Sequence, residues 1–268
     1  EMVHQAYESA DRQLGRLMAE LDEDTTVIVM SDHGAGPIKG VFYLNNWLHQ
    51  QGLLAYKVQR QKTASLCLKE ARRLAKRYLP RATKNLIKTR FHAIRDRVES
   101  HLYFSHIDWA NTKVYGFGMY GNIYINVKGR EPEGRVNPGP EYEALRDRII
   151  RDLSTLRAPH TGEAIIQEVL RREDLYDGPY IDRAPDLLIR WRDYSWYTSI
   201  NPEVENNDVF GPCRFLDCSQ YRHVGTHRLE GIFLAAGPEI CRGRVECAGI
   251  LDVAPTVLHL LGQTIPDD

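Results

Sequence analysis

The sequence predicts an α/β fold in which helices cover a layered α/β/α sheet. Apolar residues recur every three or four positions from Val3 to Leu21, which is typical of an amphipathic helix packed on one face. The next segment, 25–30, is short, uncharged and rich in β-branched residues, which predicts a buried strand. A helix that leads into a strand, with polar residues after the strand, is typical of layered α/β proteins.

The bulk composition is that of a globular protein with one large domain, or with one domain and a sizeable insertion. The chain has 268 residues, 43% hydrophobic and 26% charged, and a net charge of −1, which favours neither a nucleic-acid-binding protein nor an acidic tail. It contains no apolar run long enough to span a membrane. The five cysteines include no Cys-x-x-Cys pair, which argues against a zinc ribbon or a dense disulfide framework. Cys213 and Cys218 flank a short loop and could pair, but we expect free thiols in a reducing compartment and a cytoplasmic location.

The first predicted strand ends in Ser31-Asp32-His33-Gly34. Chemistry in open α/β sheets collects just past the carboxyl ends of the strands. Neighbouring side chains on a strand point to opposite faces, but Gly34 would let the chain leave the strand, so that Asp32 and His33 both turn toward one divalent metal ion. Asp and Gly are also common in ordinary turns, so the tetrapeptide alone fits either a metal-binding pair or a strand-to-loop turn.

The segment that follows shifts strongly in composition. Residues 44–50 predict a short helix closed by Gly52. Residues 57–97 hold 14 Lys or Arg against two acidic residues and predict two basic helices. These helices would contact anionic lipid or nucleic acid, cover a site for an anionic substrate, or present a solvated basic face. The predicted domains are therefore a core segment at 1–56, a basic helical insertion or cap at 57–105, and the rest of the α/β core at 106–268.

The last part of the chain is predicted to be rich in strands. A Gly-rich turn that includes Tyr120 and Asn122 precedes one strand, so Asn122 either faces substrate or serves the turn. His227, in Gly225-Thr226-His227-Arg228, is expected at the edge of a strand. Asp252 is expected to cap the last helix. The predicted strands are 112–115, 122–127, 164–170, 184–191 and 231–238, the helices are 139–156 and 253–261, and 193–221 is a long loop.

Three stretches in this order resemble the alkaline phosphatase superfamily, and within it the type I phosphodiesterase and nucleotide pyrophosphatase group. The likeness is greatest to a branch described as predicted phosphohydrolases or phosphomutases, and it extends over nearly the whole chain. The three stretches are 31–34, 225–227 and 250–262, and the supporting stretches are 42–48, 107–109, 121–132 and 184–187.

This resemblance implies an α/β fold of the alkaline-phosphatase type and a site with two divalent metal ions, usually zinc, with manganese as the other candidate. Asp32 and His33 would hold the ion beside the nucleophile, and His227 would hold the second ion. Two ions about 4 Å apart activate a nucleophile and stabilise charge on the phosphate oxygens, and imidazole and carboxylate are suitable zinc ligands. Arg228 is either a phosphate ligand or a surface arginine.

The chain departs from the family pattern at its start. The family's opening strand with its Asp, the nucleophile and the Asp-x-x-x-His segment find no match, and His4 lacks an Asp at that spacing. We therefore expect the C-terminal portion of a larger enzyme, with its N-terminal part missing and no catalytic residue of its own. Such a half-site is expected to bind zinc weakly.

The expected function is metal-dependent hydrolysis of a small phosphoric ester, like that of phosphodiesterases and nucleotide pyrophosphatases, with this portion inactive alone. The substrate would be a small phosphate ester, and no specific nucleic acid is expected. Two alternatives remain. One is a non-catalytic domain that binds an anionic membrane or a partner protein through 57–97. The other is a phosphomutase or sulfatase on the same fold.

Overall fold

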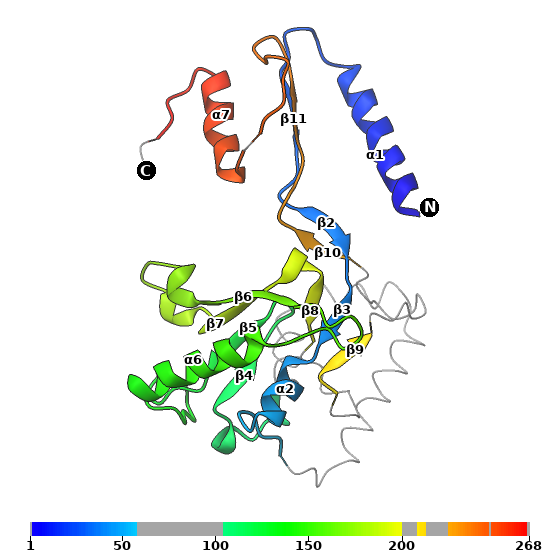
Figure 1. The fold of residues 1–268 in the computed structure, drawn as a ribbon. Coiled ribbons are helices and arrows are strands. Elements are labelled where there is room, and N and C mark those ends of the chain that lie inside the picture. The colour runs from blue at the N-terminus through cyan, green and yellow to red at the C-terminus, as the bar shows by residue number, and fades with distance from the viewer. Residues whose placement is uncertain (1, 58–103, 200–207, 213–224, 247, 267–268) are drawn as a thin grey trace, which may run out of the picture. The chain divides into compact units, whose positions relative to one another are not determined.

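The computed structural model describes residues 2–57, 104–199, 208–212, 225–246 and 248–266 (Figure 1). These residues fall into two units. The terminal unit comprises Glu1–Ala35 and His227–Asp268, and the central unit comprises Gly36–Thr226. The basic segment 57–97 lies, apart from Lys57, outside the described residues, so the insertion predicted there stays a prediction.

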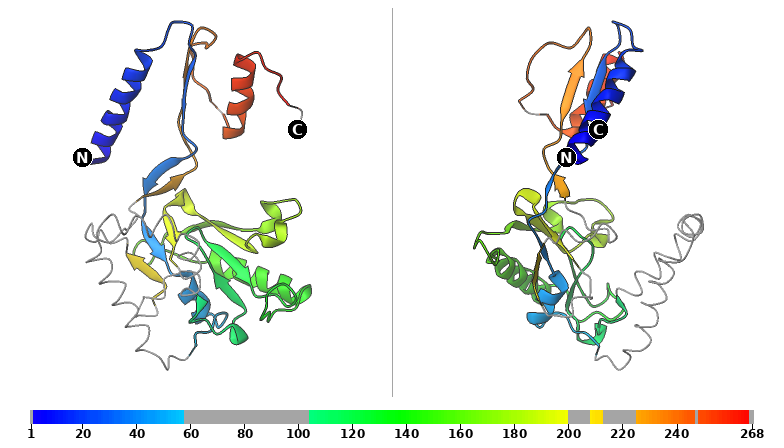
Figure 2. Two further views of the ribbon diagram at one scale, coloured as in Figure 1. Left: turned by 180° about the vertical axis from the view of Figure 1, so that it is seen from behind. Right: turned by 90° about the vertical axis from the view of Figure 1, so that its right-hand side faces the viewer.

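The terminal unit is built around a short antiparallel ribbon. Strands β1 (Val27–Met30) and β11 (Phe233–Ala236) pair over four residues, from Val27 opposite Ala236 to Met30 opposite Phe233, and run side by side in every view (Figures 1 and 2). The helices of this unit are α1 (Met2–Met18), the 3₁₀ turn η5 (Ile250–Asp252) and α7 (Val253–Leu260). A second ribbon pairs β2 (Gly34–Pro37) with β10 (Gly225–Arg228), and the division between the units falls within both strands.

The sequence predicts α1, β1, β11 and α7 correctly, but it misses β2 and β10, and the predicted burial is not observed. The described apolar side chains of α1 are largely exposed, with Tyr7 at 69%, and Leu234 of β11 is 61% exposed. A two-stranded sheet has too little apolar surface to cover its own faces. The prediction of buried strands and of a helix packed on one face is therefore wrong for the described residues.

The central unit contains a four-stranded sheet in the order β4-β5-β7-β6, with all neighbours antiparallel. A three-stranded sheet has the order β8-β3-β9, in which β3 is parallel to β8 and antiparallel to β9. Helix α6 lies along the four-stranded sheet (Figure 2). The bounds are β3 (Gly40–Phe42), α2 (Leu44–Gln50), β4 (Val114–Gly116), β5 (Asn122–Ile125), α6 (Pro140–Ser154), β6 (Ile166–Arg171), β7 (Leu187–Trp191), β8 (Trp196–Thr198) and β9 (Phe210–Pro212). Four 3₁₀ turns are Trp109–Asn111, Arg172–Asp174, Ile181–Arg183 and Arg192–Tyr194.

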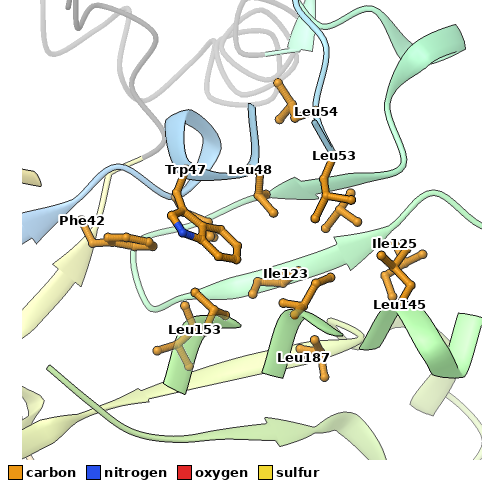
Figure 3. Close-up of a cluster of buried hydrophobic side chains, with 14 of the residues drawn as sticks. Phe42, Trp47, Leu48, Leu53, Leu54, Ile123, Ile125, Leu145, Leu153 and Leu187 are labelled. Atoms are coloured by element: carbon orange, nitrogen blue, oxygen red, sulfur yellow. The ribbon is translucent and has the colours of Figure 1, made fainter. Parts of the chain in front are cut away.

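The core of the central unit lies between α6, α2 and the four-stranded sheet (Figure 3). Leu145 and Leu153 lie on one face of α6 and meet Ile123 and Leu187 from the strands. Each such side chain contributes about 1.5–3 kcal/mol when it is fully buried. Alternate residues of β7 are buried, as the strand period of two requires.

Most predicted elements of the central unit are confirmed. Gly52, with φ of 69°, closes α2 as expected. The predicted loop at 193–221 is wrong in part, because it contains β8 and β9. These three-residue strands form by pairing with β3, which is distant in sequence and gives no local pattern.

Asp252 precedes α7 as predicted, but its carboxylate does not cap that helix. Asp252 Oδ2 accepts a hydrogen bond from the backbone N of Gly249 at 2.7 Å and so closes η5 instead. Cys241 is a free, exposed thiol, and the other four cysteines lie outside the described residues. In the described parts of the chain, no helix is both long and apolar enough to cross a membrane.

Candidate functional site

The chain bends at Asp32 and His33, between β1 and β2. Ser31 fixes the start of this bend. Its backbone N donates to the carbonyl of Ile232 at 3.1 Å, and its Oγ accepts from the backbone N of Ile232 at 2.9 Å. Asp32 and His33 therefore follow the last strand hydrogen bonds at a defined position, at the bend that the sequence predicts.

Gly34 makes this bend possible for a different reason from the predicted one. It begins β2 and is not among the described glycines with positive φ. A Cβ at this position would collide with the carbonyl oxygen of Glu230 and lie 3.1 Å from Cβ of Arg228. Glycine is therefore required by the close approach of the opposite strand rather than by backbone freedom.

The ring of His33 is held by the backbone and lies beside Asp32. Its Nδ1 lies 2.8 Å from the carbonyl oxygen of Gly34, and because a carbonyl only accepts, Nδ1 donates this hydrogen bond. Its Nε2 lies 3.6 Å from Asp32 Oδ2. A metal-ligating histidine commonly donates its other N–H to a backbone carbonyl in this way. The pair Asp32–His33, with Asp32 76% exposed, thus fits a divalent cation.

His227 joins this pair from a distant part of the sequence. It lies on β10, and its ring stacks on that of His33 with 3.7 Å between centroids and 20° between planes. The structure thus brings His227 beside His33, as the family resemblance predicted for residues of one site.

The arrangement provides one donor pair and one single donor. No group of three or more His, Cys, Asp or Glu side chains converges among the described residues. The site as described therefore lacks the three or four protein ligands that zinc usually has in proteins. The expectation that the chain binds zinc weakly depends on this number of donors.

The two predicted substrate-binding residues lie in different units. Arg228 follows His227 on β10, and its Nη1 donates to the carbonyl of His227 at 3.1 Å. Asn122 begins β5 in the central unit. Its carbonyl accepts from the backbone N of Phe117 at 3.2 Å, which closes the Gly-rich turn. This hydrogen bond agrees with the prediction that Asn122 serves the turn. A contact between Asn122 and substrate stays a prediction.

The sequence predicts a strand at 184–191 and uses 184–187 for the family resemblance, but it does not reveal the buried ionic network at Asp186. Asp186 is fully buried and accepts hydrogen bonds from Nη1 and Nη2 of Arg130, each at 2.7 Å, from Tyr142 Oη at 2.7 Å and from the backbone N of Ile125 at 2.6 Å. The signal in the sequence was an acidic residue inside an otherwise apolar run. Asp186 joins α6, β5 and β7 and is a structural residue of the central unit.

A family model described as "Type I phosphodiesterase / nucleotide pyrophosphatase" matches residues 1–229. The match includes Asp32, His33, His227 and Arg228. It covers the whole central unit and residues 1–35 and 227–229 of the terminal unit. No curated protein and no solved structure matches the chain.

Proposed function

The chain belongs to the type I phosphodiesterase / nucleotide pyrophosphatase family, and on this premise we propose that it serves the metal-dependent hydrolysis of a small phosphoric ester. The family is one of phosphoester hydrolases within the alkaline phosphatase superfamily, so the predicted superfamily and its α/β fold are confirmed. The family is generally metal-dependent. Metal dependence of this chain, the choice of zinc or manganese, and the number of ions are parts of the proposal.

The observation that supports the proposal is the stack of His33 on His227 with Asp32 beside it. In the proposal, Asp32 and His33 hold one divalent ion and His227 holds a second. Such ions, when bound, stabilise negative charge on the phosphate oxygens. The hydrogen bond from His33 Nδ1 to the Gly34 carbonyl orients the ring.

The proposal gives Arg228 and Asn122 the task of binding substrate. The guanidinium group of Arg228 presents a planar set of N–H donors that matches two phosphate oxygens, and its position next to His227 supports this role. Asn122 would contribute an amide that both donates and accepts. Neither residue is proposed as the nucleophile.

Zinc titration of the chain tests the metal-binding half of the proposal. We expect His33→Ala and His227→Ala each to lower zinc affinity by about tenfold or more, because changes to outer partners of a metal ligand alone cost about 10–100-fold. His259→Ala, at an exposed position in the same unit, is the matched control and should leave zinc affinity unchanged. Equal zinc affinity in all three variants would contradict the proposed ligands.

The hydrolysis itself is tested on the full-length gene product that contains this sequence. We expect it to cleave bis-p-nitrophenyl phosphate with added zinc or manganese, and to lose this activity with a chelator or with His227→Ala. Activity that survives both treatments would exclude the metal site. Turnover of p-nitrophenyl sulfate instead would favour a sulfatase, and transfer of phosphate within a sugar phosphate would favour a phosphomutase.

A second candidate function is favoured by the 14 Lys or Arg in residues 57–97. A non-catalytic domain would use this charge to bind an anionic membrane or a partner, and a peripheral membrane contact is compatible with the hydrolase as well. Co-sedimentation with vesicles that contain anionic lipid should fall with added salt and with Arg72→Gln/Arg73→Gln. Arg148→Gln/Arg157→Gln, which removes the same charge outside the segment, is the control.

A further inference from the structure

A surface hollow of about 300 Å³ lies in the central unit, and its lining is basic. Its walls are formed by Ala110, Asn111, Lys113, Lys128 and Arg135. None of these lining residues is acidic, and three of the five carry a positive charge. The hollow has roughly the volume of ten water molecules, which leaves room for a phosphate group and part of the molecule that carries it.

The three cations come from three separate segments that are held together by one buried residue. Asn126 is 1% exposed, and its side-chain amide donates to the carbonyls of Thr112 at 2.8 Å and Glu133 at 3.0 Å. Its backbone N donates to the carbonyl of Lys113 at 2.8 Å, and its backbone carbonyl accepts from the N of Arg135 at 2.7 Å. The backbone positions that present Lys113 and Arg135 are thus fixed by a residue of the fold's interior.

The segment that carries Lys128 is tied to the same frame. The backbone N of Lys128 donates to the carbonyl of Val136 at 2.9 Å, one residue after Arg135. Because these backbone contacts are independent of the charged side chains, the three cations are brought together by the fold. Placing three like charges at one hollow is electrostatically unfavourable, and an anion bound in the hollow would reduce this repulsion.

The partners of the charged side chains leave the lining with excess positive charge. Lys113 Nζ lies 3.6 Å from Glu141 Oε1, at half exposure, and Lys128 Nζ donates to the uncharged side chain of Asn137 at 2.8 Å. Glu141 is also held by the backbone N and the side-chain amide of Asn137, and these hydrogen bonds keep its pKa below the usual value. Among the described residues, Lys113 is the one cation of the three that has a carboxylate oxygen within 4 Å.

We propose that this hollow binds the phosphate group of a small ester or of a lipid headgroup without the aid of a metal ion. The guanidinium of Arg135 offers paired N–H donors to two phosphate oxygens, and Lys113 and Lys128 act as point charges. The amide nitrogen of Asn111 donates one hydrogen bond to Asp108 Oδ2 at 2.8 Å, and its second N–H is the further donor in the proposal. The proposal concerns residues other than Asp32, His33 and His227, so it stands apart from the proposed hydrolysis.

The test is a titration of the chain with inorganic phosphate and with glycerol 3-phosphate, in the presence of a chelator, followed by backbone amide chemical shifts. We expect saturable shifts at residues 110–113, 128 and 135 that weaken with added salt. Lys128→Ala/Arg135→Ala should lower phosphate affinity by about tenfold or more. Arg148→Ala/Arg157→Ala removes the same charge from exposed positions outside the hollow and should leave the affinity unchanged.

Two results of this titration with chelator present would overturn the proposal: no saturable shifts in the hollow, or equal affinity in the Lys128→Ala/Arg135→Ala variant. Far-UV circular dichroism of the variant verifies that the fold persists, and Lys128→Arg should retain binding. Vesicles with and without phosphatidic acid distinguish a lipid headgroup from a soluble ester as the source of the phosphate group. Vesicle binding lost in the double variant assigns a lipid headgroup, whereas phosphate binding without vesicle binding assigns a soluble ester.

Discussion

The buried carboxylate of Asp186 illustrates how one residue holds several elements in place. A buried charge is tolerated only when it is paired and hydrogen-bonded, and Asp186 has both of the Arg130 terminal nitrogens, a tyrosine hydroxyl and a backbone N–H. We expect Asp186→Ala to lower the free energy of unfolding by about 3–5 kcal/mol, because it removes the buried carboxylate that pairs with both terminal nitrogens of Arg130 and leaves the Tyr142 hydroxyl without its acceptor. Urea denaturation followed by circular dichroism measures this loss.

Glu168→Ala is the matched control for that measurement. Glu168 pairs with Arg190 at 2.5 Å across the same sheet, but both side chains are more than one-third exposed. An exposed pair contributes about 0–1 kcal/mol. If both variants lose the same stability, the network at Asp186 is not what holds the central unit together.

Gly34 gives a second test at a single position. Because a Cβ there would meet the carbonyl oxygen of Glu230, we expect Gly34→Ala to displace the bend that carries Asp32 and His33 and to lower zinc affinity several-fold. Gly15→Ala, in α1 where a Cβ meets nothing within 4 Å, should leave zinc affinity unchanged and strengthen the helix by about 1 kcal/mol. Zinc titration of both variants separates the two cases, and unchanged affinity in Gly34→Ala would contradict the steric explanation.

The candidate site was predicted from family resemblance more than from local physics. Nothing in the periodicity around His227 indicates that its ring stacks on His33, and the resemblance alone assigned these residues to one site. The roles of Ser31 and Gly34 depend on the backbone of 230–232 across the bend. That pairing is non-local, so the sequence indicated the bend but not its cause.

Helices and strands were predictable to the extent that their pattern is local. α6 lies within the predicted helix, because Pro140 starts it and Leu145, Ile149 and Leu153 keep a four-residue spacing. β8 and β9 were missed, because strands of three residues have no periodicity of their own. The burial of β1 and β11 was overestimated, since an apolar run indicates the potential for burial rather than a partner that provides it.

The two kinds of sheet should differ in local stability. β7 has a hydrogen-bonded strand on each side, and its alternate residues are buried, whereas β1 and β11 form a two-stranded ribbon in which no residue is fully buried. We therefore expect backbone amides of β7 to exchange with solvent at least about tenfold more slowly than those of β1 and β11 in this chain. Hydrogen–deuterium exchange read by mass spectrometry or NMR measures the difference. Equal protection would mean that the ribbon is stabilised by contacts other than those described.

The small net charge of the whole chain conceals a strong asymmetry. Residues 57–97 hold 14 of the 35 Lys and Arg but two of the 36 acidic residues, so the rest of the chain is predominantly acidic. A chain of this kind is attracted to an anionic surface through one region and repelled through the other. The net charge of −1 therefore excludes neither the proposed hydrolysis of a phosphoric ester nor the proposed binding of phosphate in the hollow.

The stability of the whole chain should fall at alkaline pH, because burial raises the pKa of several tyrosines. Desolvation raises the pKa of Tyr56 to about 12 and raises the pKa of Tyr142 still further, where the hydroxyl also donates to Asp186. A group whose pKa is raised in the folded state favours folding fully below its unfolded pKa of about 10, and this contribution is lost as pH rises above it. We expect the free energy of unfolding to be level with respect to these tyrosines between about pH 7 and 9 and to fall above about pH 10. Tyr142 alone would account for a loss of about 1 kcal/mol in the free energy of unfolding at pH 11.

Urea denaturation at a series of pH values measures the effect. The unchanged chain is compared with the variants Tyr142→Phe and Tyr180→Phe, and Tyr180 lies at a 68% exposed position. The slope above pH 10 should be shallower in Tyr142→Phe and unchanged in Tyr180→Phe, and an equal slope in both would show that Tyr142 ionises as freely in the folded chain as in the unfolded one.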